Sequence, residues 1–159
     1  MANLEQHREL VREAIARNSF CTLATASAAN RPHVVGVIYA AVEGVLYVNT
    51  LETSIKARNI GQNRHVAVCI PVPQASDLPP FCVQFQGEGE VCALRDPRVV
   101  GLLAAGRLDA ITGHGVLDAP GSCFLRITPG RRVATYGLGV PLDEIMRDPI
   151  QAGRSVTLS

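Results

Sequence analysis

The sequence predicts a mainly β domain in which an antiparallel sheet closes into a barrel with helices at its margins. Six or seven short segments rich in valine, isoleucine, threonine and aromatic residues alternate with turns. Most of the connections between them are short, as in hairpins, so neighbouring strands are expected to run antiparallel. In a chain of 159 residues, closure into a barrel is the natural way to remove exposed sheet edges.

The strands are expected where apolar and β-branched residues cluster between turn residues. Pro32, Gly44 and the pair Pro129-Gly130 mark three of these turns, and the last pair is predicted to form a hairpin. A proline-rich stretch at 71–80 is predicted to be a loop. The expected strands are 20–26, 33–41, 45–49, 65–72, 81–94, 122–128 and 131–136.

Four helices are expected, at 4–17, 54–61, 97–105 and 141–146. The first has its apolar residues on one stripe. The second begins at Ser54, a good N-cap, and stops near Gly61. The third carries Pro97 in its first turn, where proline is favoured. The stretches 106–121 and 148–159 lack a clear pattern and are expected to be a loop and a loose tail.

Composition narrows the functional classes. Hydrophobic residues make up 47% of the chain and charged residues only 18%, below the usual value of about 25%. This balance fits one domain with part of its surface covered by a partner subunit. The net charge of +1 is spread along the chain, which argues against a nucleic-acid partner, because such proteins carry a basic stripe.

The five cysteines and the chain's N-terminal residues point to a cytoplasmic location. The cysteines have no C-x-x-C spacing and sit mostly in apolar runs, so we expect buried thiols in a reducing compartment and no metal site. The first ten residues do not resemble a signal peptide. No apolar run approaches the roughly 20 residues that span a bilayer, so no membrane association is expected.

The segment 49–59 carries the clearest functional signal. It runs from the end of a predicted strand into a predicted helix, whose first turn offers free N–H groups and partial positive charge to an anion. Thr50 and Ser54 add hydroxyl donors, Lys56 lies in the same turn, and Arg58 is close by. Lys56 is also the single lysine among 15 basic residues. The segment predicts a phosphate site; the alternative is a capped surface helix with solvated cations.

Several motifs together resemble the split-barrel flavoproteins related to pyridoxamine 5′-phosphate oxidase. They are Leu23-Ala24-Thr25, Arg31-Pro32-His33-Val34-Val35, Gly44-Val45-Leu46-Tyr47-Val48-Asn49-Thr50, Ser54-x-Lys56-x-x-Asn59, Asn63 and Val66. The resemblance implies a six-stranded antiparallel split barrel that forms a homodimer, with FMN or a deazaflavin coenzyme in a groove between the subunits. The deazaflavin branch is included because the bias toward arginine and the short C-terminus are similar to it.

The resemblance also implies roles for individual residues. Thr50, Ser54 and Lys56 would bind the cofactor phosphate, and Asn49 would lie beside the ribityl chain. Arg58 and Asn59 complete the expected cofactor-binding set. The strand formed by Val35, Gly36 and Val37 would lie along the isoalloxazine ring.

The function expected on this basis is an oxidoreductase that moves a hydride between the cofactor and a small organic substrate. No side chain stands out as a catalytic acid or base, which fits chemistry carried by a cofactor. Two alternatives remain: a flavin or haem carrier without catalysis on the same barrel, and a split-barrel dimer without a cofactor. The second is open because Ile55 stands where the oxidase has an arginine.

Overall fold

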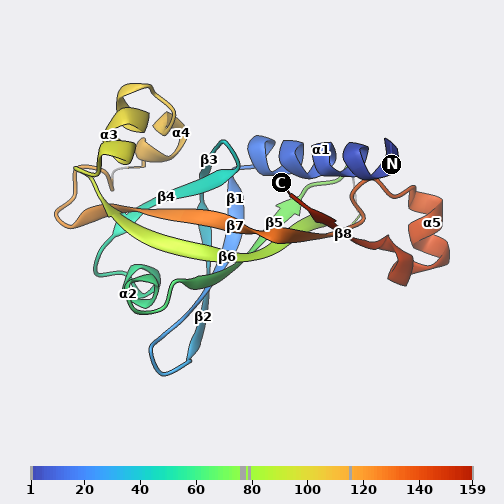
Figure 1. Cartoon of the computed structure of the whole chain (residues 1–159), viewed down its shortest axis with the longest axis horizontal. Helices are drawn as coiled ribbons and strands as arrows, with labels where there is room; N and C mark the ends of the chain where they lie inside the picture. The colour runs from blue at the N-terminus through green and yellow to red at the C-terminus, as the bar shows by residue number, and fades with distance from the viewer. Residues whose placement is uncertain (1, 76–77, 79, 115, 159) are drawn as a thin grey trace.

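One curled antiparallel sheet dominates the computed structural model, which describes residues 2–75, 78, 80–114 and 116–158 (Figure 1). The strands are β1 (Phe20–Ala26), β2 (Pro32–Ile38), β3 (Ala40–Val42), β4 (Val45–Leu51), β5 (His65–Val72), β6 (Phe81–Ala93), β7 (Ser122–Tyr136) and β8 (Gly153–Thr157). The helices are α1 (Ala2–Arg17), α2 (Ile55–Gln62), α3 (Pro97–Ala104), α4 (Asp109–Thr112), α5 (Leu142–Arg147) and the 3₁₀ turn η1 (Pro149–Ala152).

The sheet runs in the order β2-β1-β5-β6-β7-β4-β3, with β8 pairing to β7 outside this path. Its two ends, β2 and β3, are consecutive in the chain and are separated only by Tyr39. The Tyr39 N–H donates to the Ser19 carbonyl at 2.8 Å, and the Tyr39 hydroxyl donates to the Ile15 carbonyl of α1 at 2.8 Å. One buried tyrosine therefore fixes the place where the curled sheet comes back on itself, as a split barrel requires.

The main core fills the inside of the curl. Leu23, Ile70, Val83 and Leu125 are completely buried there, and α1 closes one side. A second, smaller core lies where α3 and α4 pack, around Phe124, Val99 and Leu108.

The structure confirms the mainly β class and most of the expected elements, including β1 and β5 with their expected ends. The expected strand 33–41 is interrupted at Tyr39, where the sheet turns its corner. The expected hairpin at Pro129-Gly130 is wrong, because β7 runs through both residues as one strand paired to β6.

The region around Pro129 is a bulge and not a turn. The pairing of β6 with β7 shifts register between Phe85 and Gly87, so that the long strands bend without breaking. Gly87 is needed for this close approach: a Cβ atom there would lie 2.3 Å from the carbonyl oxygen of Thr128. Sequence patterns alone do not distinguish such a bulge from a turn, since both favour glycine and proline.

The expected loose tail is also wrong. Residues 149–157 form η1 and β8, with Val156 buried in the main core. The pairing of β7 explains why. Strand β4 pairs only with the first part of β7, from Ser122 to Ile127, so the second part of β7 has an open edge. Strand β8 pairs with β7 along that edge, opposite residues 132–136. Over the described residues the sheet has eight strands, against the six that the resemblance implies. Helix α4 lies within the expected loop 106–121.

Candidate cofactor site

The candidate phosphate site lies where β4 ends and α2 begins. Ser54 is the N-cap of α2, with its Oγ accepting a hydrogen bond from the Ala57 N–H at 3.3 Å. Thr50, which is 6% exposed, donates its hydroxyl to Ser54 Oγ at 3.4 Å. The strand end and the first turn of the helix thus bring two hydroxyls together with backbone N–H groups that have no partner inside the helix.

Lys56 lies in this first turn and is half-buried. Burial lowers the pKa of its ammonium group, since a charged group loses solvation there. Among the described residues, no carboxylate forms an ion pair with it. A half-buried cation without an anionic partner, next to two hydroxyls and a helix N-terminus, is the arrangement that a phosphate would complete.

Asn49 is anchored beside this site. Its Nδ2 donates to Ser122 Oγ at 3.1 Å and to the Cys123 carbonyl at 3.0 Å, both on β7. Its Oδ1 is buried without a hydrogen-bond partner among the described residues. Buried acceptors are nearly always satisfied in proteins, so this oxygen is suited to accept a hydrogen bond from a ligand hydroxyl.

Two further residues of α2, Arg58 and Asn59, are expected to bind the cofactor; one lies at the surface and the other is buried against the sheet. Arg58 is exposed. Asn59 is 7% exposed, and its Nδ2 donates to Thr25 Oγ1 of β1 at 2.9 Å. Its amide donor is therefore used to hold α2 against the sheet, so that Asn59 positions the helix within this chain.

The expected ring-binding strand is β2, at one edge of the sheet. Val37 is buried, Val35 is half-buried and Gly36 is exposed, so that the alternation turns Gly36 away from the core. On the same outward face, Phe20, Val34 and Ile38 are 46%, 66% and 38% exposed. Helix α2 packs against both β1 and β2, and it does so on their core face, where Ala57 and Ile60 join the main core.

Next to this strip, the outer face of β1, β5, β6 and β7 forms a shallow groove. Its volume is about 460 Å³, and small residues such as Ala24, Ala67 and Ala134 line it together with Gln84 and Arg132. A neighbouring depression of about 550 Å³ contains His65 and Pro32. Sequence reasoning missed Gln84 and Ser122, because only the pairing of distant strands places them beside the other residues of the groove and the site.

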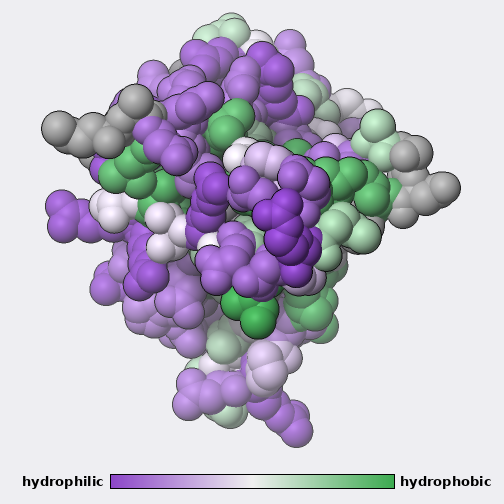
Figure 2. Space-filling view, turned by 90° about the vertical axis from the view of Figure 1, so that its right-hand side faces the viewer, coloured by the Kyte–Doolittle hydropathy of each residue, from purple (hydrophilic) through white to green (hydrophobic). Residues whose placement is uncertain are grey.

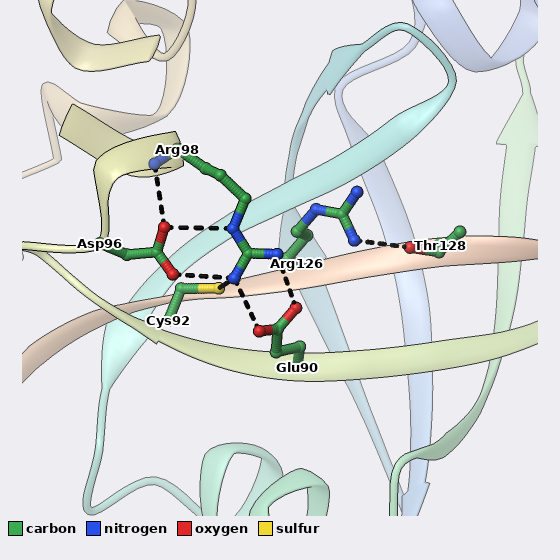
Figure 3. A network of polar contacts seen from close by, with 6 residues as sticks. All are labelled: Glu90, Cys92, Asp96, Arg98, Arg126 and Thr128. Atoms are coloured by element: carbon green, nitrogen blue, oxygen red, sulfur yellow. Dashed lines mark hydrogen bonds and ion pairs between the residues drawn. The ribbon is translucent and has the colours of Figure 1, made fainter. Parts of the chain in front are cut away.

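A separate charged cluster fastens α3 to β6 (Figure 3). Within the described residues, Glu90, Cys92 and Asp96 have ligand atoms within 4.8 Å of one another, as a metal site would require. The guanidinium of Arg98 occupies this position, at 2.7 Å from Glu90 and 2.8 Å from Asp96. These hydrogen bonds lower the pKa of Asp96 to about 2. Asp96 caps α3, and Arg98 ties the helix to Glu90 of β6. The negative charges of this cluster are therefore already paired with the Arg98 cation.

None of the helices over the described residues is both long enough and apolar enough to cross a membrane.

Comparisons with known proteins agree with this architecture. The structure is similar to a heme binding protein from Mycobacterium smegmatis, with a TM-score of 0.72 and 19% identity over 95% of this chain. This chain spans only 57% of that protein's length. It is also similar to HutZ, the heme storage protein from Vibrio cholerae, with a TM-score of 0.69 and 18% identity, covering 86% of this chain and 96% of that one.

A third similar structure is an FAD-binding protein from Mesorhizobium loti, with a TM-score of 0.62 and 21% identity, covering 79% of this chain and 90% of that one. At these identities the likeness establishes the fold alone. A search of curated proteins finds no match. The family model described as pyridoxamine 5′-phosphate oxidase matches residues 7–132, which is most of the sequence. The chain therefore belongs to the pyridoxamine 5′-phosphate oxidase family.

Proposed function

We propose that this protein binds FMN or a deazaflavin coenzyme and transfers a hydride to or from a small organic substrate. The observation that carries the proposal is Lys56. It is a half-buried ammonium without a carboxylate partner among the described residues, beside the hydroxyls of Thr50 and Ser54. These groups fit a cofactor phosphate, which would give the ammonium group of Lys56 a counter-charge and accept hydrogen bonds from the two hydroxyls.

The chain's own residues would bind and orient the cofactor. Thr50, Ser54 and Lys56 would hold the phosphate, and the unpaired Oδ1 of Asn49 would accept a hydrogen bond from the ribityl chain. The outward face of β2 at Gly36 would accept the flat ring in the place where the Phe20 side chain now lies, since a Cβ at Gly36 would be 2.9 Å from the Phe20 ring. When bound, the ring would supply the hydride chemistry, and the protein would supply position and exclusion of water.

We also propose that the protein acts as a homodimer with the cofactor between subunits. The apolar strip of Phe20, Val34 and Ile38 continues into the small-residue groove, which gives one extended surface for a second copy. A stable interface needs about 800 Å² from each partner. The end of the molecule that carries α5 differs, because its hydrophobic patches are separated by hydrophilic residues (Figure 2).

A haem-binding or haem-storage role is the second candidate. Two of the similar structures are named for haem. In this chain, His65 is exposed at the depression beside Pro32 and could supply an iron ligand. This role needs His65 and does not need Lys56, whereas the flavin role needs Lys56 and does not need His65.

The two roles can be separated by titrating the purified protein with FMN, with the deazaflavin coenzyme and with haemin. Flavin fluorescence and the haem Soret band report binding, and Lys56→Ala and His65→Ala are compared with the wild type. The proposal predicts micromolar binding of one flavin-type cofactor that Lys56→Ala weakens and His65→Ala leaves unchanged. Haemin binding lost in His65→Ala, with neither flavin-type cofactor bound, would support the haem role instead.

A further inference from the structure

A cavity opens at the edge of β7, between β4 and β8. Strand β4 pairs with β7 as far as Ile127, and the pairing with β8 begins at Arg132, so residues 128–131 are paired with neither strand along that edge. Helix α1 and the turn between β3 and β4 form the remaining walls, and the cavity has a volume of about 580 Å³. Sites for small molecules commonly have volumes of about 300–1,000 Å³.

The floor of this cavity is apolar because it is continuous with the main core. Ile15 is 2% exposed and belongs to that core, and the half-buried Ala41 and Leu158 pack against it. Val45 and Pro129 add further apolar surface to the walls. An apolar group that entered the cavity would therefore leave water and contact the core of the barrel.

Two opposite charges line the same cavity without pairing. Glu43 and Arg131 are both exposed, and within the described residues neither one forms an ion pair. The third charged residue of the lining, Arg12, is already held by Glu5 and Glu9 of α1, at 3.4 Å from each. One carboxylate and one guanidinium thus remain for a ligand, which suits a zwitterion better than an ion of either sign.

Glu43 has a backbone conformation that glutamate seldom adopts. Its φ is 53° and that of Gly44 is 79°, as in a type I′ turn, where asparagine, aspartate and glycine are preferred. Over the described part of the chain, Asn30 is the one other non-glycine residue with a positive φ, and asparagine tolerates this conformation. Such strain is concentrated at functional sites, which is an independent reason to assign a role to the Glu43 carboxylate.

We propose that this cavity binds an apolar α-amino acid. The guanidinium of Arg131 would donate hydrogen bonds to the ligand carboxylate. The carboxylate of Glu43 would accept hydrogen bonds from the ligand ammonium group. The apolar side chain of the ligand would lie on the floor formed by Ile15 and Leu158.

The cavity is separate from the proposed cofactor site and from the surface proposed for a second copy. No described residue lines both this cavity and the outer groove or the depression beside it. Arg132 lines the outer groove, and its neighbour Arg131 lies on the other side of β7. Val45 begins β4, and Thr50 lies five residues further on, about 17 Å along the strand. The inference therefore does not rest on the proposed function.

The test is isothermal titration calorimetry of the purified full chain with leucine, phenylalanine and two analogues of leucine. 4-Methylpentanoate lacks the ammonium group of leucine, and 3-methylbutylamine lacks its carboxylate. We expect the wild type to bind leucine or phenylalanine, with a Kd for each analogue at least about tenfold above that for leucine. Glu43→Gln should remove the advantage of leucine over 4-methylpentanoate, and Arg131→Gln its advantage over 3-methylbutylamine.

Two further variants separate binding from stability. Arg17→Gln makes the same change of charge on α1, at a residue that is paired with Glu13 outside the cavity, and should bind like the wild type. Ala16→Leu places a larger side chain at the mouth from an exposed helical position, and should abolish binding without lowering Tm.

The proposal is overturned if neither amino acid binds the wild type at millimolar concentration, or if both analogues bind as tightly as leucine. It is also overturned if Ala16→Leu binds as the wild type does. The comparison of leucine with its analogues uses the wild type alone and decides the matter if a charge variant fails to fold. Titration of the same samples with FMN reports on the proposed function separately, because that site shares no residue with this cavity.

Discussion

Replacing Lys56 by methionine should separate binding of the cofactor from stability of the fold. The substitution keeps most of the aliphatic stem and removes the ammonium. A hydrogen bond from a charged donor to a buried partner contributes about 1.5–3 kcal/mol, so the Kd for a flavin-type cofactor should rise by about 10- to 150-fold. Without cofactor, the free energy of unfolding should change by less than about 0.5 kcal/mol or increase, because the folded protein no longer has to desolvate a charge.

Two measurements on the same samples check this prediction. Fluorescence titration gives Kd, and urea unfolding without cofactor gives the free energy of unfolding. Arg64→Met is the matched control: Arg64 is 67% exposed, is paired with Glu88 and lies just after α2, so its loss should change Kd by less than about twofold, as expected for a surface ion pair. If Lys56→Met binds the cofactor as tightly as the wild type, the phosphate is held elsewhere.

Three further predictions concern the fold that positions the site. Asn59→Ala should lower the free energy of unfolding by about 1–3 kcal/mol in urea unfolding, because the buried Thr25 hydroxyl loses its partner; an unchanged midpoint would contradict this. Gly87→Ala should destabilise the protein by at least about 1–3 kcal/mol, since a Cβ would strike the neighbouring strand. Gly61→Ala, where a Cβ meets nothing within 4 Å, should instead stabilise α2 by up to about 1 kcal/mol. If urea unfolding gives the same change in stability for both glycine variants, the close approach of the strands at Gly87 is contradicted. Burial and then Arg154 lower the pKa of His7, so the folded state binds this proton less readily than the unfolded state. Stability should therefore be complete above about pH 6.5 and fall toward lower pH, and His7→Gln should reduce that fall in thermal melts taken from about pH 7 to pH 5.

Local patterns in the sequence predict much of this fold. The apolar alternation of β1 and β5 and the Ser54 cap of α2 lie within single segments, so each can be read from neighbouring residues. The bend of β7 and the pairing of β8 depend on which edge another strand leaves open, and no local pattern contains that information.

The candidate site divides in the same way. Thr50, Ser54 and Lys56 are close in sequence and come together as a strand end and a helix start. The hydrogen bond from Asn59 to Thr25 could not be predicted in this way, because the two residues lie 34 positions apart in the sequence.

A crystal structure of the protein with bound cofactor would test the central claim most directly. We predict that the phosphate oxygens lie about 2.7–3.0 Å from the hydroxyls of Thr50 and Ser54 and from Lys56 Nζ, with the ring along β2 at Gly36. A cofactor whose phosphate points to solvent, away from the start of α2, would contradict the account. A haem held by His65 in the outer depression would contradict it as well.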